Sequence, residues 1–92
     1  MSSIDIERSH QRSADEVRDA VERLAEKMAD RFGVEYGWDG DVMAFERPGV
    51  EGEIRIREQV VHVVASLGFM LSMMKGPIEA EIHRYLDEKL GQ

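Results

Sequence analysis

The stretch from Gln59 to Met74, QVVHVVASLGFMLSMM, contains sixteen residues without Asp, Glu, Lys or Arg, although 34% of the 92-residue chain is charged. From Val60 to Leu67, both alternating sets of positions are largely apolar. This pattern predicts a central strand, or a strand that is covered on both faces. After this strand, Gly68 and Ser72 interrupt a methionine-rich segment. Two interpretations of that segment are open: it closes the core, or it forms an apolar surface.

Two amphipathic helices are predicted, one in each half of the chain. Ser13 and Glu16 form a capping-box pattern at the start of the first helix, and Gly33 suits its end. Gly76-Pro77 favours the start of a second helix, because proline is preferred at the first helical position, and Gly91 would end it. The apolar residues of both helices recur at helical spacing: Val17, Val21, Leu24, Met28 and Phe32 in the first, and Ile78, Ile82, Tyr85, Leu86 and Leu90 in the second.

Four further strands are predicted where apolar and polar residues alternate, at positions 4–6, 34–38, 43–45 and 54–56. Turn signals separate the last strands at Asp39-Gly40, Pro48-Gly49 and Glu58-Gln59, and such short connections predict antiparallel pairing. The predicted order is β-α-β-β-β-β-α. This is a two-layer α+β fold, in which two amphipathic helices cover one face of an antiparallel sheet, in the general style of a miniature helix-grip.

Size and composition limit the class of protein. Residues 1–92 are predicted to form a single domain, because a chain this short supports one hydrophobic core. The chain has no cysteine, which excludes disulfides and thiolate metal sites. Its net charge of −7 disfavours nucleic acids and anionic membrane surfaces as partners. The uncharged stretch is shorter than the roughly 20 apolar residues of a membrane span. With no apolar leader at the N-terminus, a cytoplasmic protein is expected.

No pattern of catalytic or metal-binding residues is present in the sequence. His10, His62 and His83 fall on different predicted elements and lack metal-ligand spacing. The sequence has neither a glycine-rich phosphate loop nor a nucleophile elbow. We therefore predict no catalytic residues, no metal site and no cofactor. His62 stands among valines, which predicts a partly buried structural or interface histidine.

Four blocks spread over nearly the whole chain resemble a known family. They are IDIERSH (4–10), EVRDAVERLAEKMADRFGVEYGWDGD (16–41), FERPGVEGEI (45–54) and LGFMLSMMKGPIEAEIHRYLDEKLG (67–91). Together they resemble the small polyhydroxyalkanoic acid system proteins. The resemblance implies a cytoplasmic, non-enzymatic protein associated with granules of storage polyester. It implies no site residues, because the family has no established ones.

The methionine-rich segment is the candidate binding site. In one hypothesis, an exposed patch contacts the polyester, its coat or a granule protein, through Phe69, Met70, Leu71, Met73 and Met74. In the other, Phe69 and Leu71 continue the strand inward and Met73 and Met74 pack beneath the last helix near Tyr85. A division is also open, with Phe69 and Leu71 inside and Met70 and Met73 or Met74 outside.

Two alternative functions follow from other features. The apolar back of the fifth strand predicts a homodimer with a structural or scaffolding role, through Val60, His62 and Val64. The space between sheet and helices could hold an acyl chain, which would make the protein a small-molecule carrier.

Overall fold

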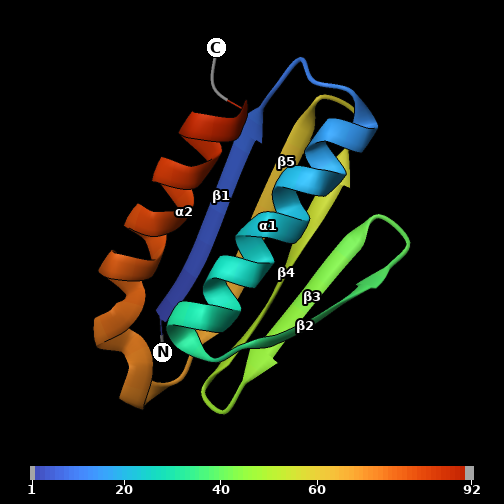
Figure 1. Cartoon of the computed structure of the whole chain (residues 1–92). Coiled ribbons are helices and arrows are strands. Elements are labelled where there is room, and N and C mark those ends of the chain that lie inside the picture. The colour runs from blue at the N-terminus through green and yellow to red at the C-terminus, as the bar shows by residue number, and fades with distance from the viewer. Residues whose placement is uncertain (1, 91–92) are drawn as a thin grey trace.

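The predicted order of strands and helices is confirmed, with one short helix added. The computed structural model describes residues 2–90. Its elements are β1 (Ser2–Ser9), α1 (Ala14–Phe32), β2 (Glu35–Asp39), β3 (Val42–Arg47), β4 (Val50–Arg57), β5 (Val60–Leu67), the short 3₁₀ helix η1 (Phe69–Met74) and α2 (Lys75–Leu90). The addition, η1, falls in the methionine-rich segment (Figure 1).

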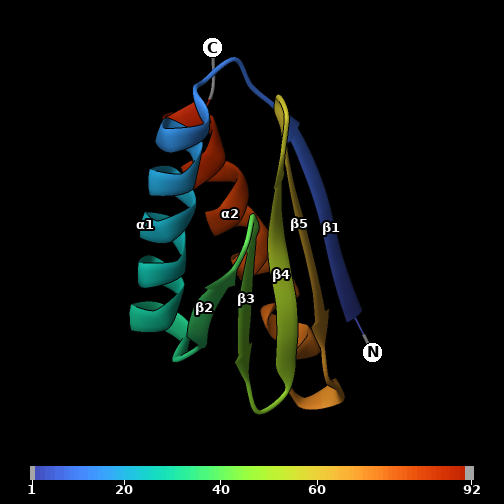
Figure 2. The same ribbon diagram turned by 90° about the vertical axis from the view of Figure 1, so that its right-hand side faces the viewer.

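The five strands form one antiparallel sheet in the order β1-β5-β4-β3-β2. β5 is an interior strand, hydrogen-bonded to β1 on one side and to β4 on the other, as its valine-rich pattern predicts. Both helices pack against the same face of the sheet, and the other face is free of helices (Figure 2). The predicted two-layer α+β arrangement is therefore confirmed.

The ends of α1 lie where the capping signals place them. The Ser13 hydroxyl accepts the amide of Glu16, and the Glu16 carboxylate accepts the amide of Ser13, both at 3.2 Å. Gly33 has φ 73° and donates its amide to Ala29. α2 begins earlier than predicted, at Lys75, and Pro77 is its third residue. A proline is tolerated there because the first amides of a helix have no partner within it. The predicted end at Gly91 lies outside the described residues.

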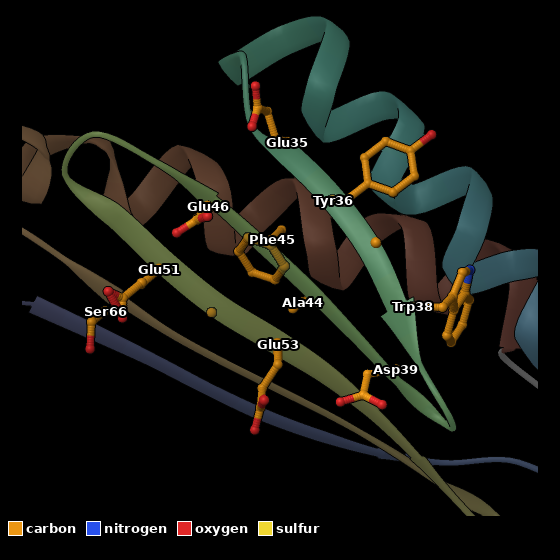
Figure 3. A pocket seen from close by; sticks show the side chains of 12 residues that line it. Glu35, Tyr36, Trp38, Asp39, Ala44, Phe45, Glu46, Glu51, Glu53 and Ser66 are labelled. Carbon is orange, nitrogen blue, oxygen red and sulfur yellow. The ribbon is translucent and has the colours of Figure 1, made fainter.

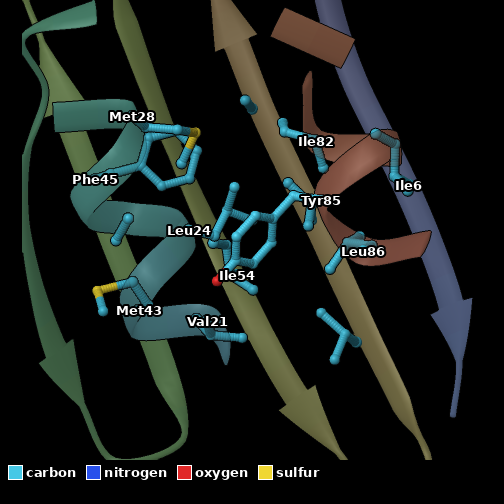
Figure 4. Close-up of a cluster of buried hydrophobic side chains, with 14 of the residues drawn as sticks. Ile6, Val21, Leu24, Met28, Met43, Phe45, Ile54, Ile82, Tyr85 and Leu86 are labelled. Carbon is cyan, nitrogen blue, oxygen red and sulfur yellow. The ribbon is translucent and has the colours of Figure 1, made fainter. Parts of the chain in front are cut away.

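The core fills the space between the sheet and the two helices (Figure 4). Leu24 of α1, Ile54 of β4 and Tyr85 of α2 meet near its centre. The two layers are also joined at β2, where the Trp38 indole donates to Glu22 of α1 at 2.6 Å and Arg18 stacks over the Trp38 ring. This second attachment holds the edge of the sheet against the first helix.

Tyr85 carries one of the few unpaired polar atoms of the core. Its side chain is 4% exposed, and its hydroxyl has no hydrogen-bond partner among the described residues. Burial raises the pKa of Tyr85 above its ordinary value of 10.0. We expect Tyr85→Phe to raise the free energy of unfolding at pH 7 by about 1 kcal/mol, because it removes a buried hydroxyl that lacks a partner. Urea denaturation measures this change.

The same substitution has a predictable pH dependence. A raised pKa in the folded state means that the unfolded chain loses the Tyr85 proton first, so the native protein loses stability as the pH rises from about 10 to the folded pKa. The Phe variant should lack this part of the alkaline loss. A Phe variant that is less stable at pH 7 would contradict the prediction, since it would reveal a bonded hydroxyl.

Candidate functional site

The chain changes direction at the end of β5 and leaves the sheet. Leu67 is fully buried and is the last residue of the strand. The amide of Gly68 then donates to Gly49 in the β3–β4 turn at 2.8 Å, and the amide of Leu71 donates back to Gly68 at 3.0 Å. These two bonds start η1 in place of a longer strand. The predicted inward continuation through Phe69 and Leu71 is therefore wrong.

Within η1, residues three apart lie on the same side of the helix, because a 3₁₀ helix has three residues per turn. Leu71 faces the protein, and Met74, in the same row, is the least exposed methionine of η1. Leu71 packs onto Gly49 so closely that a Cβ there would lie 2.9 Å from its Cδ1. The row of Met70 and Met73 faces solvent, and Phe69 lies beside it. Of the predicted binding residues, only Leu71 is thus directed inward, and the predicted burial of Phe69 is wrong.

The exposed side chains of η1 form a patch at one end of the molecule. Phe69 is 81% exposed, Met70 84%, Met73 88% and Met74 36%. They are the only large hydrophobic side chains exposed in the described part of the chain, and we call these four the tip patch. Packing of Met73 beneath α2, the alternative to exposure, is therefore wrong. Figures 1 and 2 place η1 at the end of the sheet opposite the β4–β5 turn.

The tip patch lies in the part of the chain that is poorest in charge. No Asp or Glu occurs between Glu58 and Glu79, and Lys75 is the one Lys or Arg in that interval. The Ser72 hydroxyl, a polar group within η1, is also hydrogen-bonded inside this helix, because it donates to the Phe69 carbonyl at 2.9 Å. The patch can therefore cover an apolar surface without desolvating a carboxylate of its own segment.

The helix-free face of the sheet has the opposite character. A hollow of about 710 Å³ lies over β2, β3 and β4, and five carboxylates surround it: Glu35, Asp39, Glu46, Glu51 and Glu53 (Figure 3). Glu35, Glu46 and Glu51 stand directly opposite one another in three adjacent strands. None of these three forms an ion pair within residues 2–90. Like charges in such register repel one another.

Almost the whole chain matches the sequence model of one protein family. A sequence model for a family described as "Putative polyhydroxyalkanoic acid system protein" matches residues 4–90. The chain belongs to this family. The resemblance read from the sequence blocks is confirmed by that match. No curated protein and no solved structure matches the chain. No helix in the described part of this family member is long and apolar enough to cross a membrane.

In this polyhydroxyalkanoic acid system protein, the predicted dimer residues Val60, His62 and Val64 lie on the helix-free face and are partly buried. His62 donates from Nε2 to the Asp5 carboxylate at 2.6 Å, and its Nδ1 lies 3.9 Å from a Glu7 oxygen. These neighbours are exposed acids on β1. Hydrogen bonding to Asp5 therefore fits the predicted structural role of this histidine.

The charge of the helix-free face opposes its pairing with a second copy. Strand residues that alternate with the buried ones lie on the helix-free face, and they include seven acids and two arginines. The net charge of this face is therefore −5, out of −7 for the whole chain. The charged residues are Asp5, Glu7, Glu35, Asp39, Glu46, Glu51, Glu53, Arg55 and Arg57. The homodimer stays a prediction, which sedimentation at micromolar concentration tests: a monomer would contradict it.

The cross-strand row of Glu35, Glu46 and Glu51 is the feature that the sequence analysis did not predict. Each glutamate alone is typical of the solvent side of a strand. Only the strand register places Glu35, Glu46 and Glu51 side by side. Alternation places each glutamate on the solvent side of its strand. Pairing the strands through the Asp39-Gly40 and Pro48-Gly49 turns would then have predicted that the three glutamates lie opposite one another.

The histidines and the space between the sheet and the helices are two further candidate sites. The three histidines lie apart: His10 is buried before α1, where its Nδ1 accepts the amide of Arg12, and His83 lies beside Arg8. No three His, Asp or Glu side chains in residues 2–90 are arranged to hold a metal ion. The cavity between sheet and helices is apolar and measures about 20 Å³. Such a space holds about one water molecule, so an acyl chain would require the core to open.

Proposed function

We propose that this family member is a non-enzymatic cytoplasmic protein that binds the surface of polyhydroxyalkanoate granules through the tip patch. The observation that carries the proposal is the exposure of Phe69, Met70 and Met73 on one short helix. Membership of the polyhydroxyalkanoic acid system family supports an aliphatic polyester as the partner. Large apolar side chains that gather on a surface mark interaction sites.

The chemistry of the tip patch suits a disordered polymer surface. Methionine is flexible and polarisable, so its side chain adapts to an irregular partner. Burying Phe69, Met70 and Met73 would contribute roughly 5–9 kcal/mol before the costs of binding, at about 1.5–3 kcal/mol for each side chain. The carboxylates of the helix-free face belong to elements other than η1. They can therefore stay hydrated while the tip patch contacts the polyester.

A binding assay with particles of poly(3-hydroxybutyrate) tests the proposal. We expect the native protein to sediment with the particles, and Phe69→Ser with Met70→Ser to weaken binding by roughly 100-fold, since two buried side chains are lost. Both residues lie outside the core, so the melting temperature should stay within a few degrees of the native value. Isolation of granules from cells should show the same loss of association.

The matched control is Arg57→Ser with Glu58→Ser, at the last residue of β4 and in the turn that follows it. These two residues are exposed and lie at the end of the sheet opposite the tip patch. Replacing one arginine and one glutamate leaves the net charge of the protein unchanged. We expect this variant to bind as the native protein does. Equal loss of binding in both double variants would refute the tip patch as the binding site, and so would native binding by the Phe69/Met70 variant.

A further inference from the structure

The methionines of the chain differ sharply in their access to solvent. Met70 and Met73 are 84% and 88% exposed and lie in the same outward row of η1. Met28 and Met43 are 2% and 0% exposed and belong to the core. Among the methionines of residues 2–90, a reagent that attacks the sulfur from water should therefore meet Met70 and Met73 first, and Met74, at 36%, after them.

We infer that Met70 and Met73 form an oxidation site, at which peroxides convert both thioethers to sulfoxides and release the protein from the granule. The selectivity of the oxidation is inferred from the exposed fractions of the methionine side chains alone. Its effect on binding rests on the proposed function of the tip patch. The oxidant is hydrogen peroxide or an organic hydroperoxide, which the cytoplasm supplies and the protein does not.

The reaction needs nothing from the protein except access to the sulfur. A sulfur lone pair attacks one peroxide oxygen, so that an S–O bond forms as the O–O bond breaks. Sulfur loses two electrons, and the other peroxide oxygen takes them with a proton and leaves as water or an alcohol. Sulfoxide reductases, which use thiols as the reductant, reverse the change.

Oxidation changes the tip patch where it matters for an apolar partner. A sulfoxide oxygen accepts hydrogen bonds from water, and these would be lost against an aliphatic polyester. Since Met70 and Met73 project side by side from one row, two sulfoxides would replace the most exposed part of the patch. The fold should be unaffected, because η1 is anchored through Leu71 and through the Gly68–Gly49 hydrogen bond.

The experiment treats the whole protein with millimolar hydrogen peroxide, locates the added oxygen atoms by peptide mass spectrometry and measures binding to poly(3-hydroxybutyrate) particles. We expect Met70 and Met73 to react first, Met28 and Met43 to stay reduced, and binding to fall by about tenfold or more per sulfoxide. The melting temperature should not change. Treatment with methionine sulfoxide reductases of both stereospecificities should restore binding.

The control is Met70→Leu with Met73→Leu, which keeps both side chains apolar and removes both sulfurs. This variant should bind like the reduced native protein and stay bound after the peroxide treatment that oxidises Met70 and Met73 of the native protein. Oxidation of Met28 or Met43 at the same rate would overturn the selective site. Unchanged binding by protein oxidised at both positions would overturn the release but leave the proposed function standing. Failure of the reduced native protein to bind would overturn both.

Discussion

Replacing Gly52 by alanine is expected to lower the free energy of unfolding by about 3 kcal/mol. Gly52 lies in β4, with hydrogen-bonded strands on both sides. A Cβ at this position would lie 2.5 Å from the Val64 carbonyl oxygen, 2.7 Å from Phe45 Cζ and 2.8 Å from Ala65 Cβ. The Phe45 ring could turn aside at a cost, but the Val64 carbonyl belongs to the sheet. The added methyl group must therefore displace backbone.

Urea denaturation of Gly52→Ala measures the loss, and Gly37→Ala is its matched control. Gly37 is also a strand glycine, in β2, but a Cβ there would meet nothing within 4 Å. Alanine at position 37 should change stability by no more than about 0.5 kcal/mol. Equal stability of the two variants would show that the close approach of the Val64 carbonyl to Gly52 is absent in solution.

Leu24→Ala should cost about 3 kcal/mol or more of unfolding free energy. Leu24 is fully buried on α1, and it lies between the sheet and α2, close to Ile54 and Tyr85 (Figure 4). Truncation removes apolar contacts with both layers at once. The surrounding residues belong to separate elements, so the cavity cannot close by moving one side chain.

Two comparisons separate this effect from a general response to mutation. Leu24→Met conserves volume and should cost less than about 1.5 kcal/mol. Phe69→Ala removes a larger side chain, but from a position that is 81% exposed, and should change stability by no more than about 0.5 kcal/mol. If Phe69→Ala destabilises the protein as much as Leu24→Ala, the tip patch is part of the core and is not a free surface.

The contrast between Leu24 and Phe69 also explains how stability and binding can be separated in this chain. The core is complete without the tip patch, because Leu71 alone of η1 packs against it. The exposed side chains of η1 are therefore available for an apolar partner. Variants of Phe69, Met70 and Met73 therefore test the proposed binding while the fold is preserved.

Most of the fold could be predicted because its signals are local. The capping box at Ser13 and Glu16 lies within one turn, and Gly33 ends the same helix through its own positive φ. Alternation in each strand assigns its residues to two faces, since successive side chains point in opposite directions. The start of α2 was predicted late, because η1 leads directly into it and Lys75 already has helical angles. That continuity depends on the preceding turn, which the Gly76-Pro77 signal does not contain.

The sequence by itself determined the two layers, the apolar character of both faces of β5 and that of residues 67–74, because these follow from periodicity and composition along the chain. Only the tertiary structure decided the direction of those residues. The hydrogen bond from Gly68 to Gly49 joins positions in separate strand connections, and it turns the chain away from the sheet just after Leu67. Hydrophobicity is a property of each side chain, whereas exposure depends on which other segments the fold has already placed beside it. The methionine-rich stretch is therefore largely exposed, with Leu71 alone of η1 packed against the core.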